Sequence, residues 1–216
     1  TYLEHSLVLS QETAKEAFTS CIGHSIRESM YPIIEDIKVF LTYPQTMRSI
    51  MICGPHKSGK HHLLRCIMQY LKIDTEQLLH IDCAAIALGK LTISDIMQRI
   101  DTSLDQEKSN IILFENLDAL TELPASITTM ETLLRFYQRM AESNELNLLF
   151  LAVTAMNEHF LQLQKLFQKV YELPDLNSRT LKEKYEFVLH FMQNEADAIG
   201  KTISLSSSIL NCFATA

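Results

Sequence analysis

Motif-forming cysteines and long apolar runs are missing from this 216-residue sequence, and glycine is scarce. No two cysteines have C-x-x-C spacing and their total of five is odd, so the sequence supports neither a zinc site nor a redox motif. We expect reduced cysteines packed in the core of a cytosolic protein. No apolar run approaches the roughly 18 residues of a membrane span. We therefore expect no membrane-spanning segment.

Positive charge is also in deficit. Nineteen Lys and Arg residues stand against 26 Asp and Glu residues, for a net charge of −7. Nucleic-acid affinity depends on clustered Lys and Arg, so this balance argues against a nucleic-acid partner. Hydrophobic residues make up 47% and charged residues 21%, which is typical of an ordered globular chain. Residues 1–5 contain neither an initiator methionine nor a secretory pattern, so we expect a domain excised from a longer protein.

One motif carries most of the chemical information. Residues 54–61 match G-x-x-x-x-G-K-[ST] at every position except the last, and two of the five glycines occupy its glycine positions. In such a loop the backbone N–H groups cradle phosphates, the lysine neutralises them and the closing hydroxyl holds Mg²⁺. His61 has no hydroxyl, so the motif leaves Mg²⁺ uncertain. We predict that ATP or ADP binds to Gly54, Pro55, His56, Lys57, Ser58, Gly59, Lys60, His61 and His62.

The residues on either side of this loop have the required patterns. Residues 49–53 form a short apolar run that predicts a buried strand. Residues 61–72 carry leucine, isoleucine and methionine at helical spacing, which predicts a helix opening at the end of the loop. The positive end of that helix dipole would favour a bound anion.

Strand and helix patterns alternate along the rest of the chain. Further strands are predicted at 80–83, 110–114, 146–153 and 170–173, and further helices at 92–104, 130–142 and 180–198. This order predicts an α/β P-loop NTPase with a parallel five-stranded sheet and helices on both faces. We divide the chain into a helical lead-in (1–48), a large nucleotide-binding subdomain (49–176) and the truncated start of a small helical lid (177–216).

A second element of the site is predicted where the apolar strand 110–114 ends. In P-loop enzymes an acidic residue at this point holds Mg²⁺, and Glu115 occupies it. The next residue, Asn116, stands where many such enzymes carry a catalytic carboxylate, and an amide cannot accept a proton from water at neutral pH. Asp118 is near, but lies beyond the strand end. Glu115 and Asn116 thus form a degenerate catalytic pair, and we predict little or no hydrolysis.

The stretch Tyr171 to Arg179, in which a short strand runs into Pro-Asp and then a helix, resembles the AAA+ ATPases over about residues 25–200. That resemblance implies a polar sensor residue after the fourth strand, where this chain has Ala155, with Asn157 two residues late. It also implies arginine fingers before the last strand, yet no arginine lies between Arg139 and Arg179. By this resemblance the domain neither hydrolyses its own nucleotide nor activates that of a neighbour.

Within the superfamily, residues 58–66 and 80–90 resemble the first ATPase domain of the double-ring peroxisome-biogenesis ATPases. This likeness implies a hetero-hexamer formed with a sister ATPase, a protein substrate, no nucleic acid, and contact with membrane only through an adaptor. The implied location is the cytoplasm, peripheral to the peroxisomal membrane. The sequence leaves three alternatives open: a working ATPase, a DNA-associated module like those of origin recognition or clamp loading, and a small-molecule kinase.

Overall fold

The computed structural model describes residues 24–43, 47–73, 78–105, 109–122, 124–144, 147–157 and 160–201. Five strands form one sheet: β1 (Met47–Gly54), β2 (Leu78–Asp82), β3 (Asn110–Glu115), β4 (Leu148–Ala155) and β5 (Lys169–Glu172). The strand order is β2-β3-β4-β1-β5, and every recorded pair is parallel. The predicted five-stranded parallel α/β fold is therefore confirmed.

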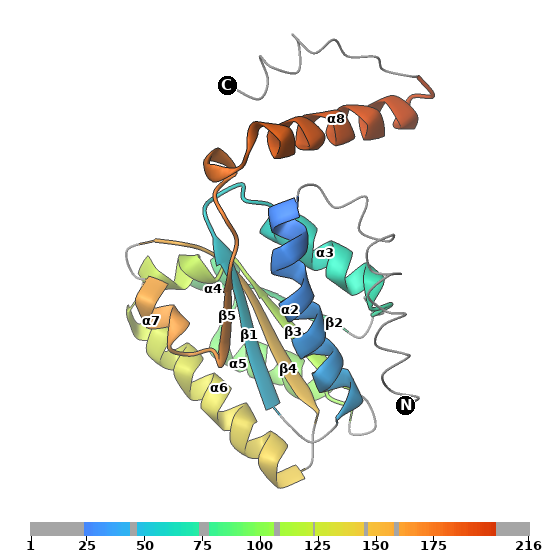
Figure 1. Ribbon diagram of the computed structural model, residues 1–216. Coiled ribbons are helices and arrows are strands. Elements are labelled where there is room, and N and C mark those ends of the chain that lie inside the picture. Colours follow the sequence, from blue (N-terminus) through green and yellow to red (C-terminus); the bar gives the residue numbers. More distant parts are fainter. Residues whose placement is uncertain are drawn as a thin grey trace.

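Seven α-helices connect or flank these strands within the described residues (Figure 1). They are α2 (His24–Thr42), α3 (Lys60–Tyr70), α4 (Cys83–Ala87), α5 (Ile93–Ser103), α6 (Pro124–Asn144), α7 (Phe160–Gln164) and α8 (Leu181–Ala198). Two 3-10 turns, η3 (Leu117–Glu122) and η4 (Leu176–Ser178), complete the order. None of the described helices combines the length and apolar content needed to cross a membrane.

The sheet separates two apolar layers. On one face α2 and α3 pack against alternate strand residues such as Ile52 and Leu151. On the other face α5, α6 and α7 pack against the intervening residues, among them Phe114 and Phe150. The rings of these two residues stack with their centroids 5.6 Å apart. Both sides of the central strands are thus buried, which explains why their sequences are continuously apolar rather than alternating.

Several element boundaries differ from the predicted ones for local reasons. The helix expected from residue 130 begins at Pro124, because proline is favoured in the first turn, where its missing N–H costs nothing. The short helices α4 and α7 span five residues each, too few to show a helical period. Residues 1–23 of the expected lead-in and 202–216 of the expected lid lie outside the described residues, as do Cys21 and Cys212. Among the described cysteines, Cys53 and Cys83 are buried free thiols.

Candidate nucleotide-binding site

The phosphate-binding loop joins the end of β1 at Gly54 to the start of α3 at Lys60. Gly59 has φ +91° and caps the helix in the left-handed conformation, which glycine adopts without steric cost. Gly54 is required for a different reason: a Cβ there would lie 2.9 Å from the carbonyl oxygen of Leu173. The loop therefore needs one glycine for backbone conformation and the other for close packing.

Lys60 is the buried cation of the loop. Its Nζ donates hydrogen bonds to the carbonyl oxygens of Gly54 at 2.9 Å and Pro55 at 2.6 Å, and to Ser58 Oγ at 3.3 Å. Burial lowers the pKa of the Lys60 ammonium, and the nearby carboxylate of Asp118 acts in the opposite direction. The loop thus holds a desolvated positive charge, which favours an anionic ligand.

A pocket of about 330 Å³ opens above this lysine. Its lining residues come from the loop, from the ends of β3 and β4, and from α8: His56, Lys57, Gly59, Lys60, His61, His62, Asn116, Asp118, Val153, Thr154, Ala155 and Phe187. Six of the nine predicted loop residues line it. The other three, Gly54, Pro55 and Ser58, do not line it and accept hydrogen bonds from Lys60.

Glu115 occupies the end of β3 as the sequence predicts, but it is not among the residues that line the pocket. Its carboxylate accepts a hydrogen bond from His80 Nε2 at 2.8 Å, and His61 Nε2 lies 3.7 Å from its other oxygen. Strands β2 and β3 pair in parallel, with Asp82 opposite Glu115, so His80 is two residues from that register position. Local sequence patterns do not indicate this partner, because it comes from a neighbouring strand.

Asn116 lines the pocket in a strained backbone conformation, with φ +54°. Its side-chain amide donates to Asp82 Oδ1 at 3.0 Å, and the same oxygen accepts the Ala84 N–H at the start of α4. The amide is therefore held towards the end of β2. An amide so placed orients polar neighbours but is not a base.

Asp118 is the pocket carboxylate that sequence reasoning set aside. Although it has left the strand, the η3 turn brings it back to the end of β4, where Oδ1 accepts the Ala155 N–H at 3.0 Å and lies 3.4 Å from Thr154 Oγ1. Ala155 stands where the family resemblance implies a polar sensor. Asn157, which follows the expected sensor position by two residues, donates from its side-chain amide to Thr121 Oγ1 at 2.8 Å and does not line the pocket.

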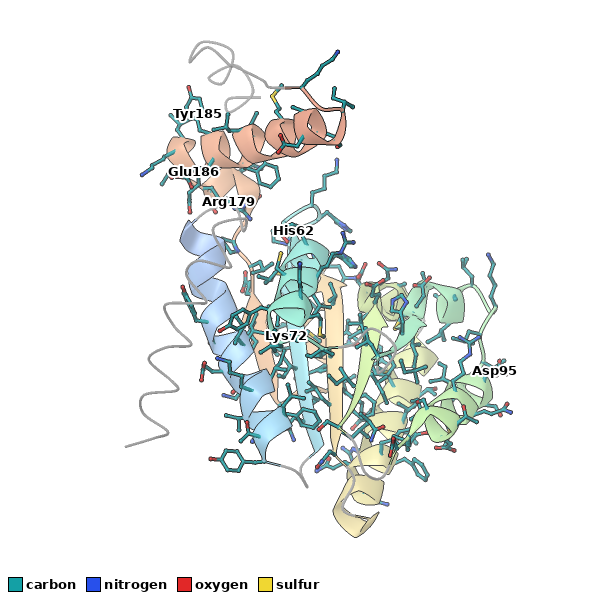
Figure 2. The ribbon with its side chains drawn as sticks, turned by 90° about the vertical axis from the view of Figure 1, so that its right-hand side faces the viewer. His62, Lys72, Asp95, Arg179, Tyr185 and Glu186 are labelled. Atoms are coloured by element: carbon teal, nitrogen blue, oxygen red, sulfur yellow. The ribbon has the colours of Figure 1, made fainter. Side chains whose placement is uncertain are left out.

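Two residues near the C-terminal end of the described chain also belong to the site and were not predicted. Phe187 of α8 lines the pocket, and Arg179, immediately before α8, donates from Nη2 to the carbonyl oxygen of Ser58 at 3.1 Å. Figure 2 shows Arg179 at the junction between α8 and the rest of the molecule, above the end of α3 that carries His62. Helical spacing indicated α8 but not its distance from the loop.

The donor set fits a nucleotide phosphate better than a magnesium ion. A glycine-rich loop, a helix N-terminus and a buried ammonium meet at the pocket, which is the chemistry that phosphate requires. Magnesium prefers several oxygen ligands in octahedral geometry. Here an imidazole stands at the hydroxyl position, and the strand-end carboxylate is bonded to His80. Within the described part of the chain, no group of three His, Cys, Asp or Glu side chains is arranged to hold a metal.

Neither a model of a known protein family nor a curated protein sequence matches this chain. Solved structures do. Caenorhabditis elegans PCH-2 matches with a TM-score of 0.58 and 15% identity over 91% of this chain and 55% of that one. The Aeropyrum pernix ORC1 protein, solved in complex with DNA, matches with a TM-score of 0.58 and 13% identity. The match covers 80% of this chain and 50% of that one. A chain of the HORMA:CdnC:Trip13 complex of E. coli MS115-1 matches with a TM-score of 0.60 and 13% identity. The match covers 94% of this chain and 76% of that one.

These neighbours have the AAA+ P-loop NTPase fold, and this chain shares it. The chain spans about half the length of the first two. Identities of this size establish the fold alone, so the chemistry of this chain must be argued from its site.

Proposed function

We propose that this chain binds ATP or ADP in the pocket above Lys60 and hydrolyses it slowly or not at all. The observation that carries the proposal is the contrast between the two halves of the site. The phosphate half is complete, with Lys60 buried and bonded to its loop. In the metal half, Glu115 is bonded to His80 and outside the pocket lining, and His61 replaces the hydroxyl residue.

Each pocket residue has a definite task in this proposal. The N–H groups of the loop and of the first turn of α3 bind phosphate oxygens, and the Lys60 ammonium neutralises their charge. Asn116 orients polar groups without accepting a proton, since it is an amide. Asp118 is the carboxylate among the pocket-lining residues, but its Oδ1 accepts the Ala155 N–H, so it supports the end of β4.

A thermal-shift titration with ATP, ADP and GTP, each with and without Mg²⁺, tests the binding. A ligand at 100 times its Kd stabilises the folded state by about 2.7 kcal/mol, which is easily detected. We expect a shift with adenine nucleotides and weak dependence on Mg²⁺. No shift with any nucleotide would remove the proposal, and robust steady-state turnover that Lys60→Ala abolishes would contradict slow hydrolysis.

We further propose that the domain stabilises a protein-remodelling ring, with residues 49–176 as the nucleotide-binding subdomain and 177–216 as part of its lid. Residues 58–66 and 80–90 most resemble the first ATPase domain of peroxin-1, a peroxisome-biogenesis ATPase that assembles with peroxin-6. On this proposal the chain belongs to a hetero-hexamer that recycles import receptors at the peroxisomal membrane. Co-expression with the sister ATPase, followed by analytical ultracentrifugation, tests the assembly. A chain that stays monomeric with its partner and nucleotide present would contradict it.

A second candidate is an AAA+ module acting on DNA. The structural likeness to the A. pernix ORC1 protein, solved in complex with DNA, favours it, while the net charge of −7 opposes it. Salt-dependent binding to duplex DNA by the 216-residue chain would favour this candidate over a ring for protein remodelling.

A further inference from the structure

Arg179 is a buried arginine between two parts of the candidate site. The residue is 6% exposed, and it lies 121 residues along the chain from the loop residue that it contacts. Burial lowers the pKa of its guanidinium, while Glu183 and Asp175 act in the opposite direction, and an arginine remains charged in either case. Besides these carboxylates, the guanidinium has a hydrogen-bond partner in the phosphate-binding loop.

The contact falls on the peptide group between Ser58 and Gly59. Nη2 of Arg179 donates to the Ser58 carbonyl oxygen at 3.1 Å, and the N–H of the same peptide belongs to Gly59. Gly59 lines the pocket and caps α3. A cation on the oxygen of a peptide polarises the whole group, so its N–H becomes a stronger donor. The guanidinium therefore acts on the phosphate cradle from behind.

The same residue is joined directly to α8. Thr180 is the N-cap of that helix and forms a capping box with Glu183, so the helix start is fixed one residue after Arg179. Phe187 lies two turns further on and lines the pocket. Among the described residues, Nε of Arg179 has no hydrogen-bond partner, so the Ser58 carbonyl is the principal recorded polar anchor of this side chain.

We propose that Arg179 is a positioning residue that holds the Ser58–Gly59 peptide in its phosphate-binding orientation and couples the start of α8 to the loop. The inference rests on the proposed nucleotide binding. Removing the guanidinium weakens the binding of ADP and ATP through the Gly59 N–H and loosens α8 from the pocket. Arg179 does not touch the nucleotide, so it acts through the loop.

The contact can be tested without any ligand. The chain has five glycines, so ¹⁵N-glycine labelling gives at most five backbone amide signals, and Gly59→Ala identifies the Gly59 signal. A hydrogen bond to the preceding carbonyl shifts that amide. We expect Arg179→Met to move the Gly59 signal in the unliganded 216-residue chain and to weaken the binding of a fluorescent ADP analogue in Mg²⁺-free buffer by about tenfold or more, the loss of one charge-assisted hydrogen bond.

Arg48→Met is the matched control. Arg48 is also an arginine whose Nε has no partner among the described residues, but it lies in β1, six residues before Gly54 and hence about 20 Å from the loop. It should leave both the Gly59 signal and the affinity unchanged. Arg179→Lys retains the charge and should recover part of the affinity, which keeps the test available if Arg179→Met does not fold.

The outcomes separate this inference from the proposed function. Wild-type affinity in both folded Arg179 variants, or an unmoved Gly59 signal, overturns the role of Arg179 while nucleotide binding stands. A wild-type chain that binds no ADP analogue removes the proposed function, and the Gly59 signal then still reports whether the guanidinium holds the peptide. An equal loss in Arg48→Met would identify a general effect on stability and would also overturn the inference.

Discussion

Replacing each loop glycine by alanine should separate the stability of the loop from its binding function. In Gly54→Ala the new Cβ lies 2.9 Å from the Leu173 carbonyl oxygen and 3.1 Å from Ser58 Oγ, and φ is +153°. In Gly59→Ala nothing lies within 4 Å of the new Cβ, and φ is +91°. The new methyl group of Gly54→Ala clashes with neighbouring atoms of the protein, whereas that of Gly59→Ala projects into open space at the edge of the pocket.

The two costs follow from these surroundings. Overpacking of a filled site costs about 1–3 kcal/mol and an unfavourable φ about 1–2 kcal/mol more, so Gly54→Ala should lower the free energy of unfolding by about 3 kcal/mol. The clash involves backbone, which cannot turn aside as a side chain can. Gly59→Ala should lower the free energy of unfolding by about 1–2 kcal/mol, because only the unfavourable φ contributes. Its methyl group, however, stands where a phosphate must approach the backbone closely, so nucleotide affinity should fall about tenfold or more.

Urea unfolding and ADP titration measure both quantities on the same samples. With a urea slope of about 2 kcal/mol per molar, the midpoint should move by about 1.5 M for Gly54→Ala and by about 0.5–1 M for Gly59→Ala. Affinity should be measured where both variants are fully folded. Equal losses of stability, or wild-type affinity in Gly59→Ala, would refute the assignment of close packing to Gly54 and phosphate approach to Gly59.

Three further predictions concern the charged and buried groups of the site. Burial lowers the pKa of Lys60, so its ammonium carries a cost in the folded state at neutral pH that falls as the pH rises through the lowered pKa and is gone above the ordinary value. Lys60→Met removes that cost together with the three hydrogen bonds that Nζ donates within the loop, so the unliganded melting temperature should change little while nucleotide affinity falls on the order of 100-fold; near-wild-type affinity would contradict this. In Asp118→Asn the new amide oxygen can still accept the Ala155 N–H, but the negative charge in the pocket is lost. The affinity for ADP in Mg²⁺-free buffer should therefore rise about fivefold. Weaker binding would show that the charge is needed. Burial raises the pKa of the Cys53 thiol from 9.0 to about 11, so its thiolate fraction at pH 8 should be about 100-fold lower than in urea-unfolded protein. Alkylation followed by peptide mass spectrometry measures this difference. Equal alkylation rates in folded and unfolded protein would place Cys53 at the surface.

The Cys53 prediction has a counterpart in stability. A thiol whose pKa is raised on folding stabilises the protein fully below pH 9, and this contribution is lost as the pH rises through about 11. The thiol packs at the end of β1, where its Sγ lies 3.5 Å from the Tyr171 carbonyl oxygen.

The sequence alone predicted the sheet and the phosphate half of the site because both depend on local patterns. Continuous apolar runs mark strands covered on both faces, and the strand, loop and helix around Lys60 are contiguous in the chain. The position of Glu115 at the end of β3 follows from the same local reasoning. Element ends shifted by a few residues where a proline or a very short helix left no periodic signal.

The partners of these residues depended on the tertiary structure, because they are remote in sequence. His80 reaches Glu115 since parallel register aligns the carboxyl ends of β2 and β3, and Asp118 reaches Ala155 across 37 residues since β4 lies beside β3. Arg179 reaches the loop across 121 residues because β5 pairs with β1 and delivers the chain above it. The sequence by itself determined a loop that can hold phosphate. Strand order and register decided which carboxylate lines the pocket, which one is bonded to histidine, and which arginine contacts the loop.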